Sequence, residues 1–456
     1  MIFERFYLGC LSHASYLLGS EGTAAVVDPQ RDVAIYLEEA QKRALSIAYI
    51  IETHMHADFV SGHRELAALT GARIYAGARG EAGFPHVPVR DGDTLEFGRS
   101  RLRFLETPGH SLDSISVLVT DLDRSLEPFA VLTGDTLFIG DVGRPDLAKG
   151  TSPAEMAAML YRSLRDKLLK LPDDVEVYPA HGAGSLCGKQ LSDEARSTIG
   201  RENATNYALQ AASEAEFVRL ITSDLPERPE YFALDREINR AGAAALGELP
   251  PMRALRPRDF GDAVVLDTRP AAQFTAAHVP GSVHIGLAGQ FAGWAGALLG
   301  LKTPLVLVAE NEERLEEART RLARVGIESV VGYLEDGIAG WAREGLPLER
   351  TPRIAVQELF RQLDSFQVVD VRRAAERAGG YIDGSLGMPL DAVNARMSEL
   401  DRARPAAVHC KGGYRSAIAA SLFQRGGFKQ VFDVTGGFDA WRACNLPYLQ
   451  LQRVNS

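Results

Sequence analysis

The sequence predicts a multidomain α/β protein, and three observations support this fold class. The chain has 456 residues, and at about 100–200 residues per domain this length predicts about three domains. The first half alternates short apolar strand signals with helical stretches, and the second half contains an internal repeat of about 100 residues. The predicted domains cover residues 1–248, 252–350 and 353–453.

Short apolar runs in the first half predict strands, and polar residues follow several of them. The runs lie at residues 49–51, 101–105, 114–119, 129–132 and 175–178. Helical patterns at residues 33–43 and 153–171 lie between them. Strands that alternate with helices at this spacing predict an α/β domain.

The repeat in the second half is best seen in two short strand-like segments. Residues 264–269 (VVLDTR) match residues 368–372 (VVDVR), and a Gly-Ser pair follows each at the same distance. Each copy then closes on a tryptophan, Trp341 in the first and Trp441 in the second. A solenoid unit has about 20–50 residues, so this longer repeat predicts two tandem α/β domains with parallel sheets. Linkers are expected at residues 249–251 and 348–353.

Composition excludes several classes of protein. The formal net charge is −10 and no block of Lys and Arg stands out, which argues against a nucleic-acid surface. No apolar run approaches the ~18 residues of a membrane span, and residues 1–5 do not resemble a signal peptide. Four cysteines in so long a chain do not make a disulfide framework, so we expect a reducing, cytoplasmic setting.

Histidine and aspartate residues gather near the predicted strand ends of the first half. The candidates are His54, His56, Asp58, His63, His110, Asp135 and His181. A lone histidine is more often a capping or core residue, and His63, within the predicted helix 61–70, is expected at the surface. Several at strand ends favour a metal site. Imidazole and carboxylate ligands without thiolate suit a catalytic zinc or iron better than a structural zinc.

At these residues the chain resembles the metallo-β-lactamase superfamily over about residues 1–245. The resemblance implies an αββα sandwich with metals at one sheet edge. In dinuclear hydrolases of that superfamily, such as glyoxalase II, the run is His-x-His-x-Asp-His. Here His54-Met55-His56-Ala57-Asp58 is followed by Phe59, which cannot bind a metal.

This departure favours the persulfide dioxygenase branch of the superfamily, which uses one Fe(II). The resemblance implies that His54, His110 and Asp135 hold the iron as a two-His-one-carboxylate triad, which leaves positions for O₂ and a thiolate substrate. His56, Asp58 and His181 would then orient the ligands and hold waters around the metal. Zinc is the less favoured metal.

The segment 134–146 also resembles the fused members of that branch. Within it, Arg144 is a candidate to bind a carboxylate of the thiol cosubstrate. An ordinary salt bridge within the loop is the alternative for this arginine.

A cysteine loop follows a predicted strand in the last repeat. It reads Cys410-Lys411-Gly412-Gly413-Tyr414-Arg415-Ser416 and precedes a helical stretch. The glycines let backbone N–H groups face the sulfur, and the helix N-terminus with Lys411 and Arg415 favours a thiolate. Such a thiolate is a nucleophile able to carry a persulfide. We expect catalytic roles for Cys410, Lys411 and Arg415.

This loop resembles the active-site loop of rhodaneses, and both repeats resemble rhodanese domains. The resemblance implies that Gly412, Gly413, Tyr414 and Ser416 contact the substrate. Protein tyrosine phosphatases have five residues between cysteine and arginine, and the shorter loop here favours sulfur over phosphate. Counting back from Trp341 places Glu310 at the cysteine position of the first repeat, which predicts an inactive domain.

Three functions follow from these residues. The first is a bifunctional enzyme that oxidises glutathione or coenzyme A persulfide with O₂ to sulfite and transfers sulfane sulfur through Cys410, giving or using thiosulfate. The second is a zinc-dependent thioesterase of the glyoxalase II kind with a sulfurtransferase tail. The third is a persulfide sensor or carrier. The expected partners are small thiols, persulfides, sulfite, thiosulfate and O₂, with self-association into a homo-oligomer and no nucleic acid or membrane.

Overall fold

The computed structural model describes residues 1–223, 225 and 228–450, and it forms two compact units. The first comprises residues 1–249 with 323–326, and the second comprises residues 250–322 and those from 327 onward. The last three residues of the predicted domain 353–453 lie outside the described residues. Among the described residues no helix combines the length and apolar character needed to span a bilayer.

Two six-stranded sheets form the centre of the first unit. The first sheet has its strands in chain order: β1 (Ile2–Leu8), β2 (His13–Ser20), β3 (Thr23–Val27), β4 (Ser46–Glu52), β5 (Arg73–Gly77) and β6 (Val87–Val89). The second runs in reverse chain order: β12 (Ser197–Thr198), β11 (Glu176–Pro179), β10 (Ala130–Gly134), β9 (Ile115–Asp121), β8 (Ser100–Glu106) and β7 (Thr94–Phe97). All five predicted strands of this half lie on or overlap these strands.

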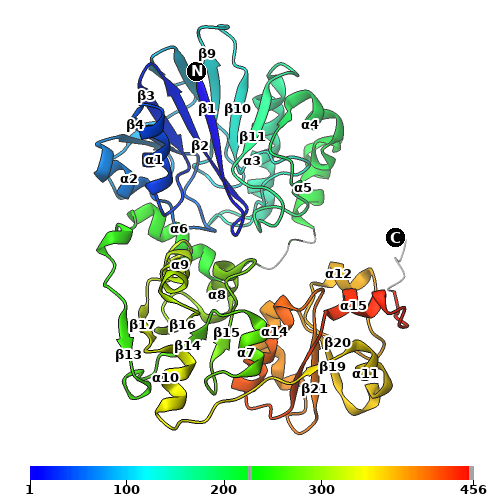
Figure 1. Ribbon diagram of the computed structural model, residues 1–456. Helices are drawn as coiled ribbons and strands as arrows, with labels where there is room; N and C mark the ends of the chain where they lie inside the picture. The colour runs from blue at the N-terminus through cyan, green and yellow to red at the C-terminus, as the bar shows by residue number, and fades with distance from the viewer. Residues whose placement is uncertain (224, 226–227, 451–456) are drawn as a thin grey trace. The chain divides into compact units, whose positions relative to one another are not determined.

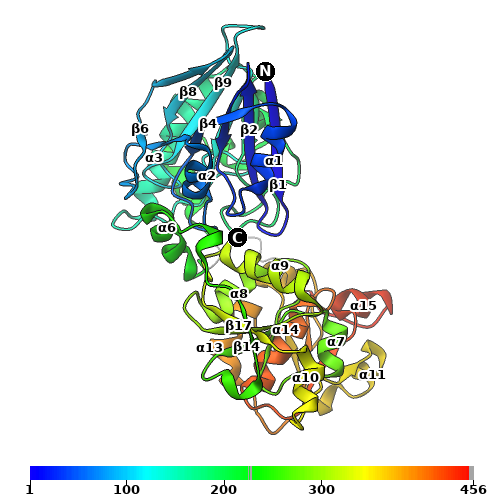
Figure 2. The same ribbon diagram turned by 60° about the vertical axis from the view of Figure 1, so that its left-hand side comes forward.

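Helices cover the outer faces of both sheets. The covering helices are α1 (Ala34–Lys42), α2 (His63–Thr70), α3 (Pro153–Asp166), α4 (Ile199–Thr205) and α5 (Glu214–Thr222). The helix α6 (Tyr231–Ala241) packs instead against the loop after β4, where Asn239 donates to the carbonyl oxygens of His56 and Phe59. Figures 1 and 2 show α1 and α2 against the first sheet, and Figure 1 shows α3, α4 and α5 on the side of the second. The start of α3 follows from its sequence, because Ser152 and Glu155 form a reciprocal capping box and Pro153 occupies the first turn.

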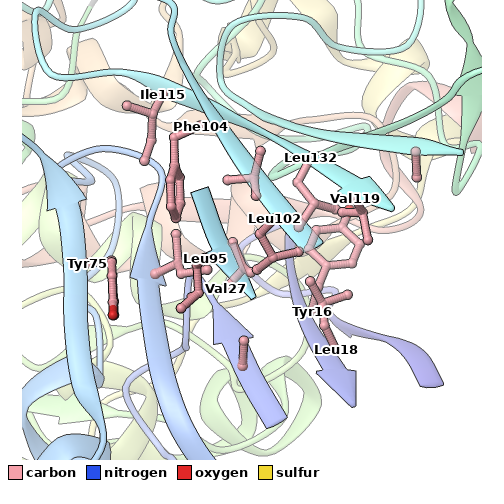
Figure 3. Packing of buried hydrophobic residues seen from close by; sticks show 14 of the residues in the cluster. Tyr16, Leu18, Val27, Tyr75, Leu95, Leu102, Phe104, Ile115, Val119 and Leu132 are labelled. Atoms are coloured by element: carbon pink, nitrogen blue, oxygen red, sulfur yellow. The ribbon is translucent and has the colours of Figure 1, made fainter. Parts of the chain in front are cut away.

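The main core of this unit lies between the two sheets. It includes Tyr16 and Leu18 of β2, Leu102 and Phe104 of β8, and Leu132 of β10 (Figure 3). Separate clusters lie under α1 and α2 and under α3 and α5. These layers confirm the predicted αββα sandwich.

The second unit contains one five-stranded parallel sheet for each copy of the repeat. The first sheet has the order β13 (Arg253–Leu255), β17 (Val330–Leu334), β16 (Leu305–Val308), β14 (Val264–Asp267) and β15 (Val283–His284). Its helices are α7 (Ala271–Ala276), α8 (Phe291–Leu299), α9 (Glu312–Ala323) and α10 (Gly337–Arg343). Both predicted parallel sheets are therefore present.

The second copy repeats this order. Its sheet runs β18 (Arg353–Ile354), β22 (Val431–Val434), β21 (Ala406–His409), β19 (Gln367–Asp370) and β20 (Leu386–Gly387). Its helices are α11 (Val356–Arg361), α12 (Ala374–Ala378), α13 (Val393–Arg396), α14 (Tyr414–Arg425) and α15 (Gly437–Ala443). The repeated VVLDTR and VVDVR segments form equivalent buried ion pairs, Asp267 with Arg269 and Asp370 with Arg372, each at 2.6 Å.

Candidate metal centre and cysteine loop

Three strand ends bring His54, His110 and Asp135 together at one edge of the sandwich. His54 follows β4, His110 follows β8, and Asp135 follows β10 directly. His110 Nε2 lies 3.4 Å from Asp135 Oδ2, and His54 Nε2 lies 3.9 Å from the same oxygen. All three side chains are buried, and their ligand atoms lie within 4.8 Å of one another. The geometry therefore unites the three residues that the sequence nominated as metal ligands.

Both histidines of this triad turn their Nε2 atoms toward Asp135 and use Nδ1 for other contacts. His110 Nδ1 lies 3.1 Å from the carbonyl oxygen of Arg144, which can only accept, so Nδ1 carries the proton. Thr53 Oγ1 donates to Asp28, so it accepts from His54 Nδ1 at 3.1 Å. Burial, the largest cause, lowers the pKa of both His54 and His110, which favours the neutral ligand form.

Several buried polar atoms at this site have no hydrogen-bond partner in the described part of the chain, and they indicate whether the site fits a metal ion. Among the described residues, His54 Nε2, both carboxylate oxygens of Asp135 and both ring nitrogens of His181 are buried without a hydrogen-bond partner. Buried polar groups normally have hydrogen-bond partners. Several unpartnered polar atoms at one site therefore need an ion or ordered water between them. The donor set of two neutral imidazoles and one carboxylate fits a divalent iron or zinc ion.

A second buried cluster adjoins the triad and contains His56, Asp58 and His181. His181 Nε2 lies 3.3 Å from Asp58 Oδ2 and 3.6 Å from Asp135 Oδ1. His56 Nε2 lies 3.1 Å from Asp28 Oδ1. Although burial lowers the pKa of His56, the neighbouring carboxylates outweigh burial and raise it to about 9. The second cluster therefore meets the triad at Asp135, through His181.

Two buried histidines were missed or misplaced by the sequence reasoning. His63 was expected at the surface, yet it is 0% exposed, with Nδ1 at 3.4 Å from Glu52 Oε1. The surface prediction was wrong because the N-terminus of α2 turns inward toward the polar residues that end β4. His13, at the start of β2, is buried beside His181 and His56. It opens a strand instead of following one, so the strand-end signal does not find it.

Phe59 fills the space next to these histidines. Its ring is fully buried, and its centroid lies 4.1 Å from that of His13 and 4.4 Å from that of His56. The side chain therefore packs among the buried histidines and adds apolar surface beside them.

Arg144 forms contacts within its own loop. Its guanidinium donates to both carboxylate oxygens of Asp146, at 2.7 and 2.8 Å, and to the carbonyl oxygen of Leu186 at 3.0 Å. The side chain is 2% exposed. The structure thus shows the loop salt bridge that was the alternative for this arginine. A cosubstrate carboxylate could bind Arg144 only if these contacts broke.

Gly143 lets the backbone of Asp135 approach His110. A Cβ atom added to Gly143 would lie 2.0 Å from the Asp135 carbonyl oxygen and 3.0 Å from His110 Nδ1. We expect Gly143→Ala to displace both residues and to weaken metal binding by about 10–100-fold, as found when residues that orient ligands are changed. A chelator competition measures this loss. Gly9→Ala is the control, since nothing lies within 4 Å of its added Cβ. Unchanged metal affinity in Gly143→Ala would contradict the expectation.

The cysteine loop lies between β21 and α14, as the sequence predicted. Cys410 follows β21, and its Sγ accepts a hydrogen bond from the Gly413 N–H at 3.1 Å. Gly413 has φ +115°, a conformation that favours glycine. Gly412 and Lys411 are exposed, whereas Cys410 is 1% exposed. The turn into α14 therefore directs a backbone N–H at the sulfur.

The other loop residues face different partners. Arg415 forms a bidentate ion pair with Glu376 of α12, at 2.6 and 2.7 Å. The Tyr414 hydroxyl donates to the Gly286 carbonyl oxygen of the first repeat at 2.9 Å. Ser416 is buried, and its Oγ lies 3.7 Å from Cys410 Sγ.

The strand register corrects the residue equivalent to Cys410 in the first repeat. Val308 pairs with Asp267 exactly where His409 pairs with Asp370, so the residue after Val308 is the equivalent. That residue is Ala309, one position before the predicted Glu310, because Ala309 lies 32 residues before Trp341 whereas Cys410 lies 31 before Trp441. The loop into α9 is one residue shorter than the loop into α14, but the segment from the start of α9 to the tryptophan is two residues longer than its counterpart. Neither residue offers a thiol.

Comparisons with known proteins agree with this layout. The Metallo-beta-lactamase superfamily matches residues 8–181, and the Rhodanese-like domain matches residues 252–344 and 355–444. Human "Persulfide dioxygenase ETHE1, mitochondrial" is 29% identical over 210 residues, which cover 45% of this chain and 75% of that protein. The hydroxyacylglutathione hydrolase of Rhodopseudomonas palustris (strain BisB18) is 33% identical over 233 residues, which cover 51% of this chain and 80% of that protein.

A solved structure covers more of the chain. A crystal structure described as a metallo-beta-lactamase from Staphylococcus aureus subsp. aureus COL aligns with a TM-score of 0.67 and 31% sequence identity. The alignment covers 74% of this chain and 99% of that one. A dioxygenase and a hydrolase thus match at similar identity, and the residues of the site have to distinguish between them.

Proposed function

Because the chain belongs to the metallo-beta-lactamase superfamily and carries two rhodanese-like domains, we propose that it oxidises a low-molecular-weight persulfide with O₂ and transfers sulfane sulfur through Cys410. The single observation that carries the oxidation half is the buried triad of His54, His110 and Asp135. Phe59 packs against the neighbouring His56. The reaction is RSSH + O₂ + H₂O → RSH + SO₃²⁻ + 2H⁺, with glutathione or coenzyme A as RSH.

The protein residues prepare the site for this reaction. A bound iron(II) ion would supply the electron exchange between O₂ and sulfur. His54 and His110 hold their Nε2 lone pairs free through the hydrogen bonds of their Nδ1 atoms, and Asp135 supplies the negative charge. Phe59 excludes water beside the cavity, which protects a reactive sulfur species from side reactions.

The sulfurtransferase reaction uses sulfite, the product of the persulfide oxidation. The Cys410 thiolate would attack the outer sulfur of a persulfide, forming Cys410–S–SH and releasing a thiolate. After loss of the persulfide proton, sulfite takes that sulfur, leaving the Cys410 thiolate and thiosulfate. Sulfite made in the first domain is a sulfur acceptor for the last, which gives the fusion a chemical purpose.

Oxygen uptake by the full chain loaded with Fe(II) tests the proposal. We expect consumption of O₂ with glutathione persulfide or coenzyme A persulfide, one equivalent of sulfite or thiosulfate per O₂, and about one iron per chain. No uptake with either persulfide by the iron-loaded protein would reject the oxidation half.

A zinc-dependent thioesterase is the second candidate, because the hydroxyacylglutathione hydrolase matches at 33% identity and His56, Asp58 and His181 form a second cluster. That activity uses a metal-bound hydroxide, and in the dinuclear relatives a second metal. Two zinc ions per chain together with thioester hydrolysis would favour it over the dioxygenase.

Phe59→His tests what this position does. The ring of Phe59 lies near His181, with centroids 6.4 Å apart, and next to Asp58 in sequence. We expect Phe59→His to raise the metal content from about one to about two ions per chain, because it adds an imidazole ligand to the second cluster. Elemental analysis measures this, with Phe59→Leu as the control that stays at one. Two metals already present in the unaltered protein would contradict the role given to Phe59.

The cellular setting is part of the same proposal. All four cysteines are free thiols, which suits the reducing cytoplasm. We propose that the chain works there as a homo-oligomer on small thiols, and light scattering at several protein concentrations would measure its assembly.

A further inference from the structure

A buried carboxylate is linked to the Cys410 thiol through one serine. Cys410 Sγ lies 3.7 Å from Ser416 Oγ, and Ser416 donates to Asp433 Oδ1 at 2.7 Å. Ser416 comes from the first turn of α14, and Asp433 comes from β22, the strand beside β21. The side chains of all three are buried, with exposures of 1%, 0% and 2%. A thiol, a hydroxyl and a carboxylate thus form a continuous chain away from solvent.

The other charged groups near Cys410, Ser416 and Asp433 have partners of their own or are exposed. Asp433 is therefore the carboxylate that is linked to the sulfur through Ser416. Arg353 of β18 lies 3.5 Å from the other carboxylate oxygen of Asp433 and is half exposed. The nearby Glu376 is engaged by Arg415 in a bidentate pair. Behind the loop, Asp370 is paired with Arg372, and Arg377 and His409 also face it. Lys411 is exposed.

Burial moves the pKa of the Asp433 carboxyl group toward neutral pH. Burial, the largest cause, raises the pKa of Asp433 to about 6, although the Ser416 hydrogen bond and Arg353 act to lower it. At pH 7 the carboxyl group is therefore ionised and can accept a proton. Its pKa lies close enough to neutral for efficient proton transfer.

We propose that Asp433 receives, through Ser416, the proton that Cys410 loses when it becomes a nucleophile. The Cys410 proton moves to Ser416 Oγ while the proton of Ser416 moves to Asp433 Oδ1, so Cys410–SH and Asp433–COO⁻ become Cys410–S⁻ and Asp433–COOH. No electron changes hands. The thiolate then attacks sulfane sulfur, as the proposed sulfurtransferase function requires, and this inference rests on that function. Asp433 touches Ser416 and not the substrate, which makes it a positioning residue.

The first repeat offers a comparison within the same chain. Strand register places Tyr333 where Asp433 lies, since Leu307 pairs with Tyr333 as Val408 pairs with Asp433. The repeat that has Ala309 in place of the cysteine thus also lacks the carboxylate. The first repeat thus lacks both ends of the proton path, the thiol and the carboxylate.

The rate at which iodoacetamide alkylates Cys410 tests the relay without using sulfur transfer. With peptide mass spectrometry to isolate the Cys410 signal, we expect the rate in the unaltered full chain to show a step near pH 6, because protonated Asp433 below that pH cannot accept the proton. Asp433→Asn keeps an oxygen for the Ser416 hydrogen bond but cannot take the proton. It should slow alkylation at neutral pH by about 10–100-fold and remove the step.

Companion variants separate the relay from structural effects. Ser416→Ala should match Asp433→Asn, and the double variant should be no slower than either alone, since both break one chain. Asp433→Glu should restore part of the rate. Asp439→Asn is the matched control, because this carboxylate is exposed on α15 near the same loop. A step near pH 6 that persists in Asp433→Asn would overturn the relay, whereas absence of sulfur transfer in the unaltered protein would instead overturn the proposed function.

Discussion

Asp135→Ala is expected to abolish oxygen uptake, with a loss of at least about a thousandfold. The Asp135 carboxylate is the common neighbour of both histidine clusters, at 3.4 Å from His110 Nε2 and 3.6 Å from His181 Nε2. Its removal leaves two neutral imidazoles with no negative charge to hold a divalent cation. Iron content measured after loading should fall together with oxygen uptake, while transfer of sulfur from thiosulfate to a thiol stays unchanged.

The stability of the same variant can be predicted as well, and its measurement requires no activity assay. Both oxygens of Asp135 lack hydrogen-bond partners among the described residues, so in the metal-free protein this buried carboxylate has little to stabilise it. We expect metal-free Asp135→Ala to unfold at the same temperature as the metal-free unaltered protein or higher. Iron should raise the unfolding temperature of the unaltered protein only, because binding to the folded state adds stability.

Asp123→Ala is the control for both measurements. Asp123 is an exposed aspartate that pairs with Arg99 at the surface of the same domain. It should change neither metal content nor oxygen uptake. Full iron content in Asp135→Ala would show that the metal lies elsewhere and would remove the basis of the dioxygenase proposal.

Strand ends in the sequence located the candidate ligands, and the resemblance to the persulfide dioxygenase branch singled out His54, His110 and Asp135 among them. His110 and Asp135 each follow a strand of one sheet, and His54 follows a strand of the other. Because β8 and β10 both run antiparallel to β9, they end at the same edge of their sheet, which places His110 and Asp135 together. The apolar runs alone identify the strands but not their directions, so they give candidates and not the ligand set.

Other features depend on packing that no local pattern encodes. His63 faces inward because Glu52 and Phe84 offer a polar partner and a ring to stack on, and both lie on other segments. From the sequence, Arg144 can be expected to bind either a cosubstrate carboxylate or a carboxylate of its own loop. Which of the two it binds depends on how the loop folds, and in the structure it binds Asp146. Counting back from the tryptophan led to Glu310 because the first repeat has one residue more than the second between this position and its tryptophan, a difference visible only in the strand register.

Asp433 illustrates the same limit for the cysteine loop. The loop sequence predicts a strand, a turn with glycines and a helix, and the structure has all three. The carboxylate that reaches Ser416 comes from the next strand of the sheet and has no motif of its own. Register between β21 and β22 places it there, and register is a property of the assembled sheet.

Cys410→Ser should abolish sulfur transfer, by at least about a thousandfold, and leave oxygen uptake intact. The hydroxyl can accept the Gly413 hydrogen bond and fits the same buried space, so the loop should keep its shape. It cannot hold a persulfide, because sulfane sulfur needs a sulfur partner. Mass spectrometry after treatment with thiosulfate should find one added sulfur on Cys410 in the unaltered protein and none in the variant.

The control is Cys444→Ser, which removes a half-buried thiol of the same domain that contacts Gln357. It should retain both activities. The two sites have separate residues, so the serine variant at position 410 should release free sulfite from persulfide and O₂ where the unaltered protein makes thiosulfate. Loss of both activities in Cys410→Ser, with iron content unchanged, would argue that the thiol takes part in the oxidation itself and would contradict the division of chemistry between the metal triad and the cysteine loop.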